Sequence, residues 1–198
     1  MPVLHLIAGP NGAGKSTLYR YLIHPRYPQL PFVNADLYER EQLGHIRHAV
    51  RRSEAARTWA DIQRRAHLEA GEAFVSETVF SHPSKLQLIA EARALGFEVA
   101  LYAVCLDDPR RLLERVQQRV HEGGHDVPVN KILARYPRTL ENLRLAVREV
   151  QLAMLFDAAD TETGGPHLVA SVVGGQVRPH GPWLPAWARK VLSPAETA

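Results

Sequence analysis

The sequence contains a single cysteine, Cys105, so no disulfide can form within the chain. This cysteine lies in an apolar run, and we expect a buried, unreactive thiol. No apolar run approaches the length of about 20 residues that a membrane-spanning helix needs, so we expect no contact with a membrane. The first residues also lack the basic stretch of a secretory signal peptide, and we therefore expect a cytoplasmic protein.

Lysine is scarce, because only four of the 24 basic residues are lysines and the others are arginines. The formal net charge of +3 would suit a nucleic-acid-binding protein. However, arginines beside acidic residues at helical spacing usually form an exposed, charged helix face. Aromatic residues do not alternate with the basic ones, as they do in single-strand binders, so we expect no nucleic-acid partner. An arginine excess equally suits a phosphate-handling site, since guanidinium groups bind phosphate oxygens in pairs.

Short apolar segments alternate with helical patterns along the 198 residues. This alternation predicts an α/β fold with a five-stranded, mainly parallel sheet that helices cover on both faces. The expected strands are Val3–Ala8, Phe32–Asn34, Ala73–Ser76, Glu98–Leu106 and Leu168–Val173. The expected helices are Ser16–Ile23, Ser53–Ala70, Ser84–Leu95, Pro109–Glu122 and Pro128–Ala153.

The predicted domain organisation is simple. Residues 1–175 are expected to form one domain, with a helical lid at about residues 110–138. Residues 176–198 are rich in proline and glycine and form a C-terminal extension, whose apolar patch around Trp183 and Trp187 is expected to pack on the domain. We expect the last six residues to be disordered.

The most informative segment follows the first expected strand and has the Walker A pattern: glycine, four residues, then Gly-Lys-Ser. Glycines let the backbone turn through positive φ and bring its N–H groups close to a polyphosphate. Lys15 is expected to bind the β- and γ-phosphates of ATP, and the hydroxyl of Ser16 to bind the accompanying Mg²⁺. The predicted ATP-binding residues are Gly9, Pro10, Asn11, Gly12, Ala13, Gly14, Lys15, Ser16 and Thr17.

Acidic residues follow three of the expected strands, and ligands of open parallel sheets bind outside the carboxyl ends of the strands. Asp36 can accept a proton from a substrate hydroxyl that attacks the γ-phosphate, or it can cap the helix that begins near residue 37. Glu77 and Thr78 can contact the substrate or the Mg²⁺, or can simply bond the neighbouring loop. For Asp107 and Asp108, which precede a proline, we expect helix capping.

The last two expected helices are rich in arginine where they approach each other, and two successive glycines lie between them. In the lid of a small kinase, Arg119 and Arg135 would neutralise charge on the transferred phosphoryl group; the alternative is a pair of solvated basic helices. His125 lies in the Gly-Gly-His segment between the helices, where it can contact substrate or bond the backbone. We expect the three arginines of the helix Ser53–Ala70 to form an exposed face: Arg57, Arg64 and Arg65.

Taken together, these segments resemble the compact branch of the zeta toxin family of P-loop kinases. The resemblance is carried by residues 9–17, Asn34-Ala35-Asp36, residues 76–81, residues 123–128 and Arg135-Tyr136. It implies a fold like that of nucleoside monophosphate kinases. It also implies ATP-dependent phosphorylation of a nucleotide-sugar, the 3′-hydroxyl of UDP-N-acetylglucosamine, and an antitoxin as a partner.

The same resemblance assigns roles to individual residues of this chain. It places the Walker lysine at Lys15, the catalytic aspartate at Asp36, and the substrate-contacting pair at Glu77 and Thr78. Two alternatives remain open at the sequence level. One is a kinase of a polynucleotide 5′-hydroxyl, and the other is an ATP-binding module without transferase activity.

Overall fold

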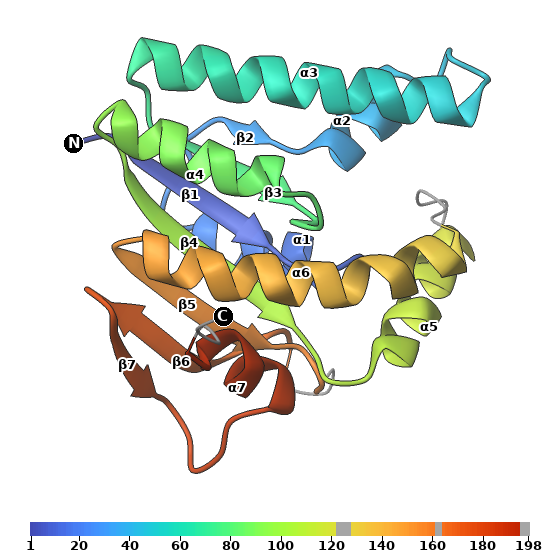
Figure 1. Ribbon diagram of the computed structural model, residues 1–198. Helices are drawn as coiled ribbons and strands as arrows, with labels where there is room; N and C mark the ends of the chain where they lie inside the picture. Colours follow the sequence, from blue (N-terminus) through green and yellow to red (C-terminus); the bar gives the residue numbers. More distant parts are fainter. Residues whose placement is uncertain (122–127, 161–163, 195–198) are drawn as a thin grey trace.

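The computed structural model describes residues 1–121, 128–160 and 164–194, and these residues form one seven-stranded sheet with helices on both faces (Figure 1). The strand order is β2-β3-β1-β4-β5-β6-β7. The first five strands in that order run parallel, whereas β6 and β7 are antiparallel to their neighbours. The strands are β1 Val3–Ala8, β2 Phe32–Val33, β3 Phe74–Thr78, β4 Glu98–Cys105, β5 Leu152–Asp157, β6 His167–Val173 and β7 Gln176–Pro179.

The helices lie in two layers. Helices α3, α4, α6 and α7 pack on one face of the sheet, and α1, η1 and α5 pack on the other. The helices are α1 Lys15–Leu18, its π-helical continuation η1 Tyr19–Ile23, α2 Ala35–Gln42, α3 Ala49–Ala70, α4 Ser84–Ala94, α5 Pro109–His121, α6 Val129–Glu149 and α7 Ala186–Leu192. Helix α2 follows β2 directly and lies beside α3, so it reaches the edge of the sheet where the parallel strands end (Figure 1).

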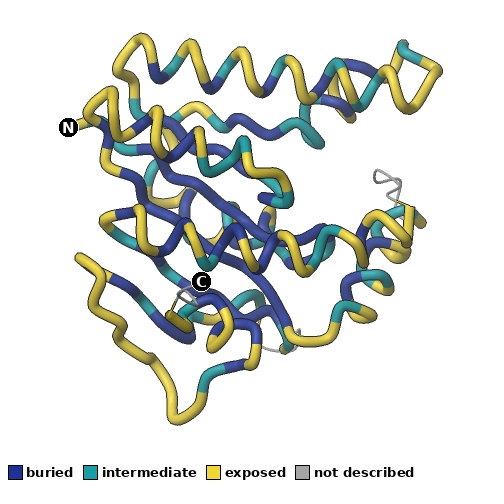
Figure 2. Tube along the Cα trace, in the orientation of Figure 1, coloured by how far each residue is buried: buried dark blue, intermediate teal, exposed yellow. Residues whose placement is uncertain are grey.

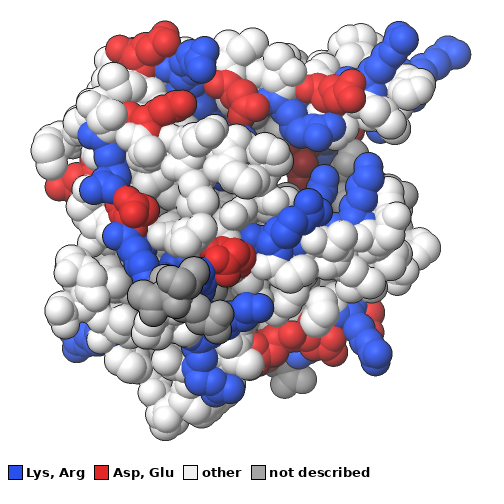
Figure 3. All heavy atoms as spheres, in the orientation of Figure 1, with Lys and Arg blue, Asp and Glu red and all other residues white. Residues whose placement is uncertain are grey.

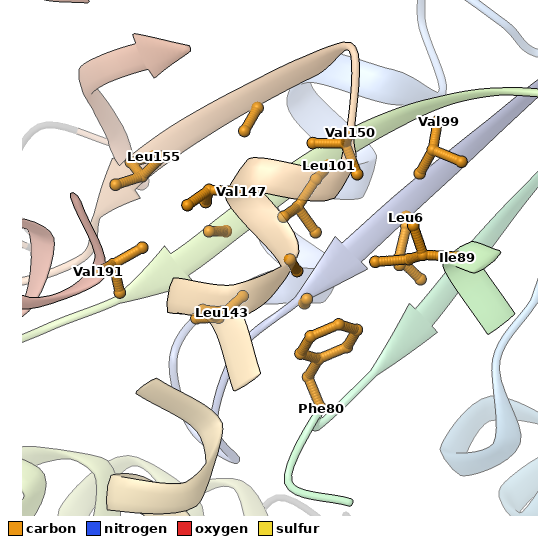
Figure 4. Close-up of a cluster of buried hydrophobic side chains, with 14 of the residues drawn as sticks. Leu6, Phe80, Ile89, Val99, Leu101, Leu143, Val147, Val150, Leu155 and Val191 are labelled. Carbon is orange, nitrogen blue, oxygen red and sulfur yellow. The ribbon is translucent and has the colours of Figure 1, made fainter. Parts of the chain in front are cut away.

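The larger core lies between the sheet and the layer of α4 and α6 (Figure 4). There, Leu6 of β1 and Leu101 of β4 face Ile89 of α4 and Leu143 of α6. Figure 2 shows the central strands as the most continuously buried part of the chain, while the outer faces of the helices are exposed. Because helices cover both faces, the central strands consist of apolar runs rather than alternating apolar and polar residues.

The prediction of an α/β fold with a mainly parallel sheet is confirmed, but the number of strands is not five. Residues 152 and 153 were assigned to the end of the helix Pro128–Ala153, whereas the structure ends α6 at Glu149 and begins β5 at Leu152. No glycine or proline separates the two elements, and an apolar run alone does not distinguish a buried strand from a helix. The second missed strand, β7, lies in the segment that was expected to be an extension, and it pairs with β6.

Two further boundaries differ from prediction for local reasons. Strand β2 ends at Val33, because Asn34 is the N-cap of α2 and its side chain accepts a hydrogen bond from the N–H of Leu37. Asp36 is therefore not the helix cap and lies in the first turn. Helix α3 begins at Ala49 rather than Ser53, because His48 caps it by accepting from the N–H of Arg51.

The C-terminal segment contacts the domain through α7. Trp187 is 1% exposed, whereas Trp183 is 64% exposed, so only one of the two predicted tryptophans is part of the core. Asp107 accepts hydrogen bonds from the backbone N–H groups of Ala186 and Trp187 at 3.0 and 2.6 Å, which caps α7 rather than the helix that follows it in sequence. Asp108 does cap that helix, since it accepts from the N–H of Arg110 at 2.9 Å.

Two sequence predictions fall partly or wholly outside the described residues. Residues 195–198 belong to the segment expected to be disordered, and 122–127 belong to the expected lid. Across the described ranges, no helix combines the length and the apolar composition that crossing a membrane requires.

Candidate active site

The loop between β1 and α1 owes its path to glycine. Gly9, Gly12 and Gly14 all have positive φ, at 155°, 79° and 88°. A Cβ atom on Gly9 would lie 2.0 Å from the carbonyl oxygen of Val104, and one on Gly12 would lie 2.6 Å from that of Leu112. Side chains at these positions would therefore clash with the backbone of β4 and α5, so the loop can take this path only with glycine.

Lys15 opens α1 and folds its side chain back over the loop. Its Nζ donates to the carbonyl oxygen of Pro10 at 3.0 Å and lies 3.8 Å from Oε1 of Glu77. Only 7% of the lysine side chain is exposed. The neighbouring Asn11 has a buried Oδ1 without a hydrogen-bond partner among the described residues. The loop thus presents a buried cation, an unused amide oxygen and the exposed hydroxyl of Ser16, which suits a polyphosphate with its metal ion.

Glu77 joins three strand ends at this point. Its Oε2 accepts hydrogen bonds from Ser16 Oγ at 3.0 Å and from Asn34 Nδ2 at 2.9 Å, while Oε1 faces Lys15. These groups follow β1 and β2, and Glu77 itself belongs to β3. The parallel register places Ile7 of β1 beside Glu77, which brings the loop after β1 to the carboxylate.

Burial lowers the pKa of Lys15 and raises the pKa of Glu77, because it disfavours the charged form of each group. Desolvation lowers the pKa of Lys15, although the negative charges of Glu77 and Asp36 partly restore it. Desolvation likewise raises the pKa of Glu77, opposed by Lys15 and reinforced by Asp36. The charge of Arg119 acts on both groups. Lys15, Glu77, Asp36 and Arg119 therefore form one electrostatic unit.

A cavity of about 490 Å³ opens beside this unit. Asp36, Glu77 and Thr78 line it at the strand ends, and residues of α3, α4 and α6 form the remaining walls. Thr78 also bonds its own loop, because its Oγ1 accepts from the N–H of Phe80 at 3.3 Å. Figure 3 shows Lys and Arg side chains on both sides of the hollow between α3 and α6. The cationic lining residues are Lys15, Arg57, Arg64, Lys85, Lys131, Arg135 and Arg138.

The prediction that Arg57, Arg64 and Arg65 form an exposed face is wrong for Arg64 and incomplete for Arg57. Arg64 is 5% exposed and donates to Ser76 Oγ at 2.8 Å, to Asp61 Oδ1 at 2.6 Å and to the carbonyl oxygen of Glu77 at 3.4 Å. Arg57 is exposed but lines the cavity. Helical spacing alone placed Arg64 outside, because the sequence does not reveal that β3 lies beneath this face of α3.

Two site residues were not predicted to act there. Asn34 fixes Glu77 and caps α2 with one amide, and Lys85 of α4 bonds Asp61 Oδ1 at 3.0 Å beside Arg64. The sequence held a signal for Asn34, since an asparagine after a short strand and before a helical pattern is a typical N-cap. Lys85 carried no such signal.

The predicted lid residues occupy different places. Arg119 on α5 is linked by its charge to Lys15 and Glu77, as described above. Arg135 on α6 lines the cavity; burial lowers its pKa, as do the charges of Arg57 and Arg138, and the charge of Asp36 opposes them. His125 and the glycines beside it lie outside the described residues. The structure thus brings together the Walker loop, Asp36, Glu77 and Thr78, with Arg119 and Arg135 on separate helices above them.

Comparison with known families decides the family of this chain. A family model described as an AAA domain matches residues 4–142, well over half of the 198 residues. The chain belongs to the AAA domain family. Its AAA domain runs from β1 into α6 and contains the Walker loop, Asp36, Glu77 and both lid arginines, while β5, β6, β7 and α7 follow it. No curated protein is a significant match to the sequence.

Several solved structures of other proteins have a fold similar to that of this chain. The AvrRxo1-ORF1:ORF2 complex with ATP matches with a TM-score of 0.66 and 19% identity, covering 98% of this chain and 64% of that chain. The PezAT chromosomal toxin–antitoxin system of Streptococcus pneumoniae matches with a TM-score of 0.62 and 16% identity, covering 79% of this chain and 68% of that chain. The Pnkp1/Rnl/Hen1 RNA repair complex matches with a TM-score of 0.56 and 20% identity, covering 71% of this chain and 45% of that chain.

These similarities establish the fold. The AAA domain is a P-loop NTPase with a mainly parallel sheet between helices, as the Walker motif predicts. The chain spans about two thirds (64%) of the AvrRxo1 chain that it matches.

Proposed function

We propose that this protein is an ATP-dependent kinase that transfers the γ-phosphoryl group to a hydroxyl of a small phosphate-bearing acceptor. The observation that carries this proposal is the position of Asp36. It lines a cavity of about 490 Å³ and its charge also acts on Lys15 of the Walker loop. A module that only binds ATP needs neither a carboxylate at that point nor a cavity that extends from the Walker loop to α3, α4 and α6.

The donor side of the reaction would use the Walker loop. Lys15 exchanges its bonds to Pro10 and Glu77 for the β- and γ-phosphate oxygens of ATP. Ser16, whose hydroxyl donates a hydrogen bond to Glu77, would hold a Mg²⁺ ion. When bound, this ion would supply positive charge that offsets the charge of the phosphates. Arg119, whose charge acts on Lys15, would stabilise negative charge on the transferred phosphoryl group.

The acceptor side would use Asp36 as general base. The acceptor hydroxyl gives its proton to the Asp36 carboxylate while its oxygen forms a bond to the γ-phosphorus. The bond between that phosphorus and the bridging oxygen breaks, and ADP leaves with the electron pair. Before this transfer, Glu77 and Thr78 would orient the acceptor from the end of β3, and the lid would exclude water that could otherwise hydrolyse ATP.

A nucleotide-sugar is the acceptor class that we propose, with the 3′-hydroxyl of UDP-N-acetylglucosamine as its first candidate. The cavity offers cations for a diphosphate together with carboxylates and hydroxyls for a sugar, among them Asp36, Asp61, Ser81 and Thr78. The resemblance to zeta toxins supports the same class. The similarity to the PezAT toxin–antitoxin system supports an antitoxin as a protein partner.

The deciding experiment is turnover of Mg·ATP against a panel of UDP-sugars, other nucleotides and a 5′-hydroxyl oligonucleotide, with product masses recorded. The expected result is the addition of one phosphoryl group to a UDP-amino sugar. Phosphorylation of the oligonucleotide alone would instead favour a polynucleotide kinase, the alternative that the cationic cavity also accommodates. ATP binding with every acceptor untouched and no hydrolysis would favour a binding module.

Two variants test the assigned roles. Asp36→Asn should keep ATP affinity and lower turnover by roughly 10²–10⁴-fold, the typical contribution of general-base catalysis. Lys15→Ala should weaken ATP binding and turnover together. Unchanged turnover in Asp36→Asn would refute the base, and intact ATP affinity in Lys15→Ala would refute the donor site.

A further inference from the structure

Three arginines on two helices crowd one part of the cavity. Arg57 belongs to α3, and Arg135 and Arg138 belong to α6; all three line the cavity that contains Asp36. The charges of Arg57 and Arg138 both act unfavourably on Arg135. We call these three residues the arginine cluster.

No carboxylate of the described residues lies within ion-pair distance of the arginine cluster. Arg57 and Arg138 each donate only through Nε, to the carbonyl oxygens of Ser53 and Ala134 in their own helices. Their terminal nitrogens have no acceptor among the described residues. Other arginines beside the site are neutralised, since Arg64 pairs with Asp61 and Arg52 pairs with Glu39. Like charges gathered without counterions are unfavourable unless a bound anion compensates them.

The two lid arginines belong to different electrostatic groups. Arg119 acts on Lys15 and Glu77, which surround the phosphates of the donor. Arg135 interacts instead with Arg57, Arg138 and Asp36. Asp36 is the one group that both sets share, and it is the proposed base at which donor and acceptor meet. Asp36 and Lys15 line the same cavity as the arginine cluster, so the cluster lies within one cavity of the Walker lysine and the proposed base.

We propose that Arg57, Arg135 and Arg138 bind a phosphate or diphosphate group of the acceptor. This inference rests on the proposed kinase function and specifies its second substrate. A guanidinium group can bind two phosphate oxygens through two parallel N–H groups, so three arginines can hold a diphosphate. The hydroxyl-bearing part of the same acceptor would then reach Asp36. An acceptor without a phosphate would leave the cluster uncompensated.

The test measures binding rather than turnover, using pyrophosphate as the probe. Isothermal titration first measures ADP with Mg²⁺, and pyrophosphate is then titrated into protein saturated with ADP and Mg²⁺. Arg57→Gln and Arg138→Gln should each weaken pyrophosphate binding by roughly tenfold, the order expected for losing a charged hydrogen bond, while ADP affinity stays unchanged. Arg138→Lys, which keeps the charge but loses the paired geometry, should fall between wild type and Arg138→Gln.

Arg65→Gln provides the matched control, because it removes the same charge from α3 at an exposed position that does not line this cavity. It should bind pyrophosphate like wild type. Equal pyrophosphate affinity in wild type, Arg57→Gln and Arg138→Gln would overturn the inference, as would equal weakening by Arg65→Gln. Absence of ADP binding would contradict the proposed function alone, since the variant series can still be measured with pyrophosphate.

Discussion

Glu77 shows how a single residue connects the parts of the site. Its carboxylate accepts from Ser16 and Asn34 and faces Lys15, so it touches the groups that are proposed to bind the metal and the phosphates. Glu77 thereby restrains Lys15 and Ser16, the residues proposed to bind the phosphates and the metal, in one conformation. Such pre-organisation lowers the entropy lost when the ligand binds.

The raised pKa of Glu77 predicts a pH-dependent stability. Burial raises this pKa above its ordinary 4.5, so the folded state holds the proton more tightly than the unfolded state. As the pH rises from about 4.5 through the folded-state pKa, the unfolded state loses its proton first, and the free energy of unfolding falls. Glu77→Gln lacks this titration. The free energy of unfolding of this variant should therefore rise relative to wild type over that range, measured by urea denaturation between pH 4 and 7.

Glu91→Gln supplies the comparison for this measurement, because the Glu91 side chain is exposed and loses little hydration on folding. Its free energy of unfolding should stay within about 0.5 kcal/mol of wild type, because exposed substitutions change stability little. Parallel pH profiles for Glu77→Gln and wild type would show that Glu77 titrates alike in the folded and unfolded states.

At the scale of elements, helix α2 is fixed by the residue that also fixes Glu77. Asn34 Oδ1 accepts from the N–H of Leu37, and its Nδ2 donates to Glu77 Oε2. The first turn of α2 carries Asp36. The orientation of the proposed base is therefore coupled to the position of the buried carboxylate through one amide group.

Two variants separate these bonds of Asn34. Asn34→Ser keeps a good N-cap but is too short to reach Glu77, so it should destabilise the fold by about 1.5–3 kcal/mol, the contribution of a hydrogen bond to a charged group. Asn34→Ala loses the cap as well and should destabilise it by about 1 kcal/mol more. Turnover should fall in the same order, because Asp36 loses its anchor only in Asn34→Ala. Denaturation and initial rates check both, and identical values for the two variants would argue against a capping role.

The elements that the sequence predicted are those defined by local patterns. The Walker loop needs glycines at fixed spacing, and the strand-end rule directed attention to Asp36 and Glu77. Arg64 was misjudged because its burial depends on β3 packing under α3, which no spacing within α3 reveals. Strand β5 was missed because its apolar run continues from α6 without a turn residue. Local sequence patterns thus located the loop and the strand ends, whereas contacts between distant segments could not be predicted.

At the scale of the whole molecule, the C-terminal helix completes the core that supports the site. Trp187 and Val191 of α7 belong to the same buried cluster as Leu6 of β1 and Leu143 of α6. Figure 4 shows Val191, Leu6 and Leu143 in this cluster. Trp187 also donates from Nε1 to Oδ1 of Asp157, a buried carboxylate at the end of β5. A helix outside the AAA domain match therefore packs on the same face of the sheet as α3, α4 and α6, the helices that form the cavity walls.

Replacing the two tryptophans of the C-terminal segment tests this packing. Trp187→Ala removes a large buried side chain and leaves Asp157 without its donor, so it should lower the free energy of unfolding by about 3–5 kcal/mol. Trp183→Ala, only a few residues away but at an exposed position, should change it by about 0.5 kcal/mol or less. Urea denaturation followed by circular dichroism measures both. If the two variants lose equal stability, α7 does not pack into the core, and the site must be held in place by the residues that precede it.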